Sequence, residues 1–218
     1  MRIIILAAGQ GFQVDGMNKC MIKDPLTGQR IIEKIILAFT NYQISVVVGY
    51  QSISIMQEYP NLHYIYNQDW GITHNSYSLA LAITDEPCYV LSCDLMFEPE
   101  LISYLGNAPE NAVLTKHSEN REINSVHCCL DGNRIVETYV GPVHNQADPE
   151  VLGIFKISDA NILRKWKQNC LDYRNLFVAQ NLPLGECAQD IYSADLENHR
   201  LDEINTPGDY MRLLNKLN

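Results

Sequence analysis

The sequence has no surplus of basic residues and no apolar run as long as a membrane span. Its 16 Lys and Arg residues face 26 Asp and Glu residues, and the formal net charge is -10 over 218 residues. Broad nucleic-acid binding needs a surplus of cations to displace counterions from phosphates, so we expect no nucleic-acid partner. A spanning helix needs about eighteen or more consecutive apolar residues, so we expect no membrane partner either.

The sequence also lacks a Cys-x-x-Cys pair, and we expect no secretory leader. Its seven cysteines are an odd number, and several stand inside apolar runs. Such cysteines are typical of buried, reduced thiols in a cytoplasmic protein, with a zinc site or a nucleophilic cysteine as the alternative. The apolar run of residues 3–8 is too short for a signal peptide, and Gly9 ends it, so we expect a cytoplasmic location.

Strand-like and helical segments alternate through the first half. The strand-like runs are residues 2–7, 44–48, 62–66 and 88–92, and the helical segments are residues 30–39, 53–59 and 75–83. This order predicts a three-layer α/β/α sandwich with a Rossmann-like, mostly parallel sheet. Ligands bind beyond the carboxyl ends of such strands, where the loop after the first strand and Asp94 stand.

The second half is richer in strand-like segments. They are residues 112–116, 124–130, 134–139 and 151–157, with an edge strand expected at 191–194. A helix is expected over 159–168, a weaker one over 172–180 and a terminal one over 206–217. No linker or repeat separates the halves, so we expect a single domain over 1–218 whose second half forms a small β-rich lobe.

The loop G-Q-G-F-Q-V-D-G-M-N-K after the first strand suggests phosphate binding. A dinucleotide-binding loop needs a third glycine where Val14 stands, followed at once by a helix. A Walker A loop needs a lysine where Met17 stands. Neither type fits.

The same loop resembles the signature of the MobA-like nucleotidyltransferases, roughly L-A-A-G-x-G-x-R followed by P-K. The matching residues here are Leu6, Ala7, Ala8, Gly9, Gly11, Gln13 and Lys19. Small residues let backbone N–H groups approach a nucleotide closely. Gln13 replaces the arginine of the signature and Asn18 its proline, so the loop has one cation fewer.

Four further stretches resemble segments of this family, and the first of them is most similar to choline-phosphate and related cytidylyltransferases. N-Q-D-W-G-I-T-H-N-S-Y-S-L at 67–79 resembles a segment that meets the nucleotide, and C-D at 93–94 resembles the strand end that binds Mg²⁺. E-V-L-G-I-F-K-I at 150–157 resembles a strand on the acceptor side. E-I-N-T-P-G-D at 203–209 resembles the family's ending, with Asn205 in place of a second metal-binding aspartate.

The resemblance implies a role for each matching residue. Lys19 and Asp94 are the expected catalytic residues, and Asp94 and Asn205 the expected Mg²⁺ ligands. The expected nucleotide-binding residues are Leu6, Ala7, Ala8, Gly9, Gly11, Gln13, Asn75, Ser78 and Cys93. The expected acceptor-binding residues are His74, Tyr139 and Lys156. On this basis residues 1–106 form a nucleotide-binding half and residues 107–218 an acceptor-binding half.

The resemblance implies transfer of CMP from CTP, or of another nucleotide, to a small phosphonate or phosphorylated acceptor, with release of pyrophosphate. An aromatic cage would suit a choline acceptor, with Tyr139, Tyr192 and Trp166 as candidates. Cationic side chains would suit a phosphonate, and His74, Lys116, Arg121, His144 and Lys156 are the candidates. Sugar-1-phosphate or pterin-cofactor transfer, and a degenerate nucleotide-binding regulator, stay open as alternatives, as does a homodimer.

Overall fold

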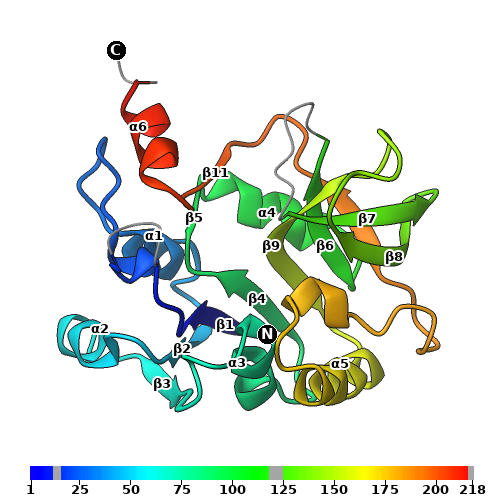
Figure 1. Cartoon of the computed structure of the whole chain (residues 1–218), viewed down its shortest axis with the longest axis horizontal. Coiled ribbons are helices and arrows are strands. Elements are labelled where there is room, and N and C mark those ends of the chain that lie inside the picture. Colours follow the sequence, from blue (N-terminus) through cyan, green and yellow to red (C-terminus); the bar gives the residue numbers. More distant parts are fainter. Residues whose placement is uncertain (12–15, 118–124, 216–218) are drawn as a thin grey trace.

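The computed structural model describes residues 1–11, 16–117 and 125–215. Its centre is a nine-stranded sheet in the order β3-β2-β1-β4-β9-β6-β10-β8-β7 (Figure 1). The first four of these are parallel, namely β1 (Arg2–Ala7), β2 (Gln43–Val48), β3 (His63–Tyr66) and β4 (Cys88–Ser92). Continuous apolar runs form the two central ones because both faces of the sheet are covered there.

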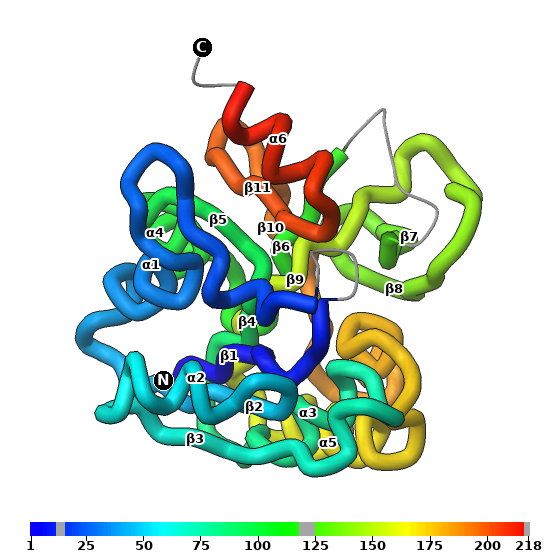
Figure 2. The backbone as a smooth tube through the Cα atoms, turned by 60° about the vertical axis from the view of Figure 1, so that its left-hand side comes forward, coloured from blue at the N-terminus to red at the C-terminus, as the bar shows by residue number. Residues whose placement is uncertain are grey.

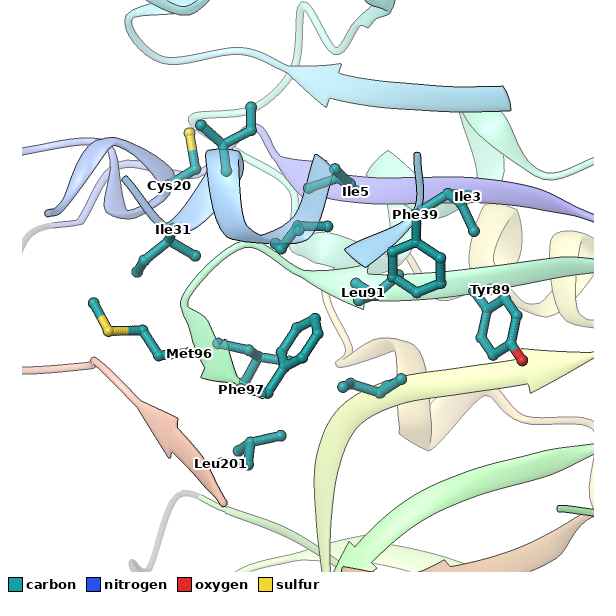
Figure 3. Close-up of a cluster of buried hydrophobic side chains, with 14 of the residues drawn as sticks. Ile3, Ile5, Cys20, Ile31, Phe39, Tyr89, Leu91, Met96, Phe97 and Leu201 are labelled. Carbon is teal, nitrogen blue, oxygen red and sulfur yellow. The ribbon is translucent and has the colours of Figure 1, made fainter. Parts of the chain in front are cut away.

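Helices cover the two faces of this sheet. Successive side chains of β1 point in opposite directions, so Ile3 and Ile5 join one core and Ile4 and Leu6 the other. The first core is closed by α1 (Ile31–Ala38), α2 (Ser52–Glu58) and α4 (Glu100–Asn107). The second is closed by α3 (Asn75–Ala82) and α5 (Ala160–Asp172). Figure 3 shows part of the first core, where Ile3, Ile5 and Phe39 pack together. The predicted three-layer fold is confirmed.

The rest of the sheet contains antiparallel strands. β9 (Glu150–Ile157) runs antiparallel between β4 and β6 (Ala112–Lys116). β10 (Tyr192–Asp195), β8 (Arg134–Val140) and β7 (Val126–Asp131) follow. The expected edge position of residues 191–194 is therefore wrong, because β10 pairs with β6 on one side and β8 on the other.

One expected helix is absent, and one small sheet is new. Residues 172–180 form no α-helix: α5 continues to Asp172, and only a 3-10 turn, η3, follows over Val178–Asn181. β5 (Leu95–Phe97) and β11 (Leu201–Glu203) form a separate two-stranded sheet that the sequence did not predict. Figure 2 shows β5, β11 and α6 (Pro207–Asn215) gathered on one side of the large sheet. This small sheet brings the segment after residue 200 to the end of β4.

Among the described residues, no helix combines the length and the apolar character needed to cross a membrane.

Candidate functional site

The loop after β1 is fastened by a buried asparagine. The Asn18 amide nitrogen donates to the carbonyl oxygens of Ala7 at 3.0 Å and Tyr50 at 3.2 Å. Its amide oxygen accepts from the backbone N–H of Cys20 at 3.2 Å and caps a 3-10 turn, η2, over Lys19–Met21. Asn18 is fully buried, so these bonds hold the backbone of Lys19 at the carboxyl end of β1.

Lys19 joins two residues that come from distant parts of the chain. Its Nζ atom lies 3.0 Å from Oδ2 of Asp94 and 2.5 Å from Oδ1 of Asn205. The backbone N–H of Ile204 donates to the carbonyl of Asp94 at 3.0 Å, which fixes the two segments together. Burial alone would lower the pKa of Lys19, but the charge and hydrogen bond of Asp94 raise it above its usual value. Lys19 is therefore a cation in this cluster.

The same cluster offers oxygen ligands of the kind that Mg²⁺ prefers. Oδ1 of Asp94 is buried and has no hydrogen-bond partner among the described residues. Asn205 adds an amide oxygen, and Mg²⁺ is usually held by one or two carboxylates together with water and substrate phosphates. Within the described residues, no group of three or more His, Cys, Asp or Glu side chains gathers as a complete protein cage for a metal. The donor set thus fits a metal ion shared with a phosphate ligand.

A cavity of about 500 Å³ opens at this edge of the sheet, beside the cluster. Lys19, Asp94 and Asn205 line it, together with His74 and Asn75 at the start of α3. Further side chains come from β6, β9, η3, β11 and α6. Its volume suits a nucleotide and a small second ligand.

The start of α3 is fastened to the segment after α5. Oδ1 of Asn75 accepts from the backbone N–H of Val178 at 3.1 Å, and the His74 ring lies edge-on to Phe177 with 4.2 Å between centroids. Nδ1 of His74 and Oδ1 of Asn75 are 2.9 Å apart. Both predicted residues line the cavity. These two contacts engage the amide oxygen of Asn75.

Other predicted nucleotide-binding residues lie outside the cavity lining. Leu6, Ala7 and Ala8 are buried at the end of β1, and Gly9 and Gly11 follow them. Gln13 is outside the described residues. The loop packs closely on its neighbour, because a Cβ atom on Gly49 would lie 2.7 Å from the carbonyl oxygen of Ala8. The proposed contact of this loop with a nucleotide therefore stays a prediction.

Two further predicted nucleotide-binding residues, Ser78 and Cys93, do not line the cavity. The Ser78 hydroxyl is buried and accepts from the Asn67 amide at 3.0 Å, so it does not face the cavity. Burial raises the pKa of the Cys93 thiol well above its usual value, followed in effect by the neighbouring charge of Asp94. A thiolate nucleophile at Cys93 is therefore disfavoured.

The structure does not bring Lys156 to the cavity, which corrects the expectation that it binds the acceptor. Because β9 is antiparallel to β4, Glu150 lies at the carboxyl edge of the parallel strands and Lys156 at the opposite edge, paired with Tyr89. The Lys156 ammonium donates to the carbonyl oxygens of Gly106 at 2.9 Å and Ala108 at 2.8 Å. Its partners are thus the last carbonyls of α4, an arrangement that stabilises a helix end.

Tyr139 is likewise occupied elsewhere, and it does not line the cavity. Its hydroxyl donates to Oδ2 of Asp148 at 2.7 Å, and its ring stacks on His144 with 3.8 Å between centroids. The side chain is buried. The expected acceptor contact of Tyr139 is therefore not supported, and neither is an aromatic cage around it.

Sequence reasoning gave no role to several charged residues that line the cavity, among them Glu150, Glu203 and Arg212. Although Glu203 is exposed at the cavity surface, loss of bulk water around its carboxyl group and the charge of Asp94 raise its pKa to about 7. Glu150 and Glu203 stood in the matched motifs, but only the antiparallel direction of β9 and the β5–β11 pairing reveal where they face.

Comparison with known proteins identifies the family of this chain. The model of the family described as the MobA-like NTP transferase domain matches residues 3–192. The chain belongs to this family. The predicted resemblance to this family is thereby confirmed, and the chain is a nucleotidyltransferase by family.

Several individual proteins are similar to this chain in sequence or in fold. The chain is 25% identical over 178 residues to CMP-5'-(3-aminopropyl)phosphonate synthase of Streptomyces rubellomurinus. That match covers 76% of the chain but only 28% of the relative's length. The solved CTP:phosphocholine cytidylyltransferase from Streptococcus pneumoniae has a TM-score of 0.77 at 19% identity, with 100% of this chain and 99% of that chain covered. Inositol-1-phosphate CTP transferase from T. maritima has a TM-score of 0.74 at 15% identity, with 99% and 95% covered. These structural likenesses show a shared fold.

Proposed function

We propose that the protein is a cytidylyltransferase that transfers CMP from CTP to a small phosphonate or phosphorylated acceptor. The observation that carries the proposal is the contact of Lys19 with Asp94 and Asn205 beside a cavity large enough for both substrates. The names of the relatives that share the fold or the sequence, which include a phosphonate synthase and two CTP-dependent transferases, support the choice of base and acceptor.

The reaction needs positioning and charge more than proton transfer. An oxygen of the acceptor's phosphate or phosphonate, already ionised at neutral pH, attacks the α-phosphorus of CTP. A new oxygen–phosphorus bond forms as the bond to the bridging oxygen breaks, and pyrophosphate carries away that electron pair. No general base is required, and Lys19 stabilises the negative charge that spreads over the α-phosphate in the transition state.

Asp94 and Asn205 would hold a Mg²⁺ ion next to the phosphates. Bound there, the ion would neutralise part of the negative charge of the phosphates. Lys19 donates to both of these residues in the structure, so its ammonium must turn toward the nucleotide when the metal site is used.

We propose that the acceptor lies in the cavity beside the paired ends of β6 and β9. Lys116 and Glu150 face each other in the register of these strands, and both line the cavity. Glu150 accepts a hydrogen bond from the Ser125 hydroxyl. Within the part of the chain that the structure describes, no ion pair joins Lys116 to Glu150, and both side chains border the cavity. Lys116 takes the role once expected of Lys156, as the cation for the acceptor's phosphate or phosphonate.

Pyrophosphate release from CTP is the direct test. The acceptors should include an aminoalkylphosphonate, phosphocholine, an inositol phosphate and a sugar 1-phosphate, each with Mg²⁺. Asp94→Ala should abolish release while CTP-independent properties such as the thermal midpoint stay intact. Asp131→Ala is the matched control, because Asp131 forms only an exposed ion pair with Arg134 in a turn. Retained release in the Asp94 variant would remove this residue from the mechanism. Absence of release with every acceptor would remove the proposed activity.

A further inference from the structure

The cavity is short of cations for a nucleoside triphosphate. Four carboxylates line it, and the described Lys and Arg residues in its lining are Lys19, Lys116 and Arg212. Lys19 lies between the proposed metal ligands, and Lys116 lies on the acceptor side. The loop position that carries arginine in the family signature is Gln13, an uncharged residue that lies outside the described residues. Arg212 is therefore the cation that remains for the outer phosphates.

Arg212 is attached to the segment that carries Asn205. Its guanidinium forms an ion pair with Oδ1 of Asp209, one turn earlier on α6. The other carboxylate oxygen of Asp209 accepts from the backbone N–H of Asn205 at 2.9 Å and from that of Thr206 at 2.6 Å. The Asp209 side chain is 8% exposed and the Arg212 side chain 71%. Asp209 thus fixes the segment that carries Asn205, while the guanidinium borders the open cavity.

This ion pair costs little to rearrange. Its guanidinium end is 71% exposed, and the other oxygen of Asp209 makes the backbone bonds, so the guanidinium can turn to a phosphate without loss of those bonds. The guanidinium is planar with five donors, so it can also bind a phosphate with one edge and keep the carboxylate on the other. Both routes leave α6 and the Asn205 segment in place.

We propose that Arg212 binds the β- and γ-phosphates of the nucleoside triphosphate and so supplies the charge that the loop after β1 lacks. The inference rests on the proposed function and adds a residue beyond positions 3–192, which the family model matches. It assigns α6 to the nucleotide site.

Direct binding of CTP and of CMP to the full chain, by calorimetry with Mg²⁺ present, tests this assignment. Arg212→Gln should weaken CTP binding about tenfold or more, because a charge-assisted hydrogen bond is lost. CMP affinity should stay unchanged, because CMP has no β- or γ-phosphate. Arg212→Lys keeps the positive charge but loses the paired N–H donors of the guanidinium. Its CTP affinity should therefore lie between that of the wild type and that of Arg212→Gln.

Arg200→Gln is the matched control, because Arg200 makes an exposed ion pair with Asp202 and does not line this cavity. Thermal midpoints show whether each variant folds. If Arg212→Gln does not fold, the CTP affinity of Arg212→Lys is the test. Equal CTP affinity in the wild type and the Arg212 variants, or equal weakening of CTP and CMP, would overturn the assignment while the proposed function stands. A wild type that binds neither nucleotide would overturn both.

Discussion

Replacement of Lys19 by methionine should change two properties of the site in opposite directions. Methionine keeps most of the length of the side chain but removes the ammonium that bonds Asp94 and Asn205. The two oxygen ligands would then be free for a divalent cation in the absence of nucleotide. The same change removes the cation that we assign to the transition state, so metal binding should improve while turnover falls.

The magnitudes follow from the geometry. The Lys19–Asp94 contact is 3.0 Å long, and the two side chains are 20% and 14% exposed, so solvent screens it only in part. A hydrogen bond to a charged group contributes about 1.5–3 kcal/mol, which corresponds to metal affinity about 10- to 100-fold higher in the variant. Loss of a preorganised charge beside the reacting phosphate costs about 100- to 1,000-fold in kcat.

Metal binding can be followed by the electron paramagnetic resonance signal of free Mn²⁺, without nucleotide or acceptor. Lys116→Met is the matched control, because it removes an equal charge from the same cavity but no contact with Asp94. If Mn²⁺ binds the Lys19 variant no more tightly than it binds the Lys116 variant, the ammonium and the metal do not compete. The shared use of Asp94 and Asn205 would then be refuted.

Two further substitutions test how the site is built. Gly49→Ala should lower the free energy of unfolding by about 1–3 kcal/mol in urea denaturation, because its Cβ would lie 2.6 Å from Cβ of Trp70. Gly71→Ala, which has open space for a Cβ, should have a much smaller effect, and equal losses would contradict the packing argument. Lys156→Met should reduce stability but leave KM for CTP and for the acceptor unchanged, since Lys156 bonds the end of α4 and lies away from the cavity. A raised KM for the acceptor in this variant would show that Lys156 does bind the acceptor.

Most of the parallel half of the sheet could be predicted from the sequence because β1, β2 and β4 are short, mostly apolar runs. The loop after β1 and the position of Asp94 followed from the same pattern, since both stand at carboxyl ends of parallel strands. Asn205 could be named from its motif, but its contact with Lys19 depends on the pairing of β11 with β5. Three-residue strands leave no periodic signal, so that pairing was invisible.

Two of the errors share one physical origin, the pairing of strands that are far apart along the chain. Side chains at the two ends of β9 lie at opposite edges of the sheet, and nothing local in an apolar run says which end faces a ligand. The sequence pattern therefore indicates Lys156 as the acceptor-binding residue of this strand, whereas the structure places Glu150 at the cavity. The interior position of β10 was missed for the same reason, because four residues with two distant partners resemble an edge strand.

The position of β9 between β4 and β6 has a consequence for how the protein is made. A ribosome adds residues 88–92 and 112–116 well before residues 150–157, so β4 presents an unpaired edge until β9 has emerged. Pairings between segments so far apart in sequence form slowly, and exposed strand edges promote aggregation in the meantime. During synthesis, the acceptor side of the cavity is thus completed late, and substitutions that slow the insertion of β9 should lower the yield of folded protein before they alter any binding constant.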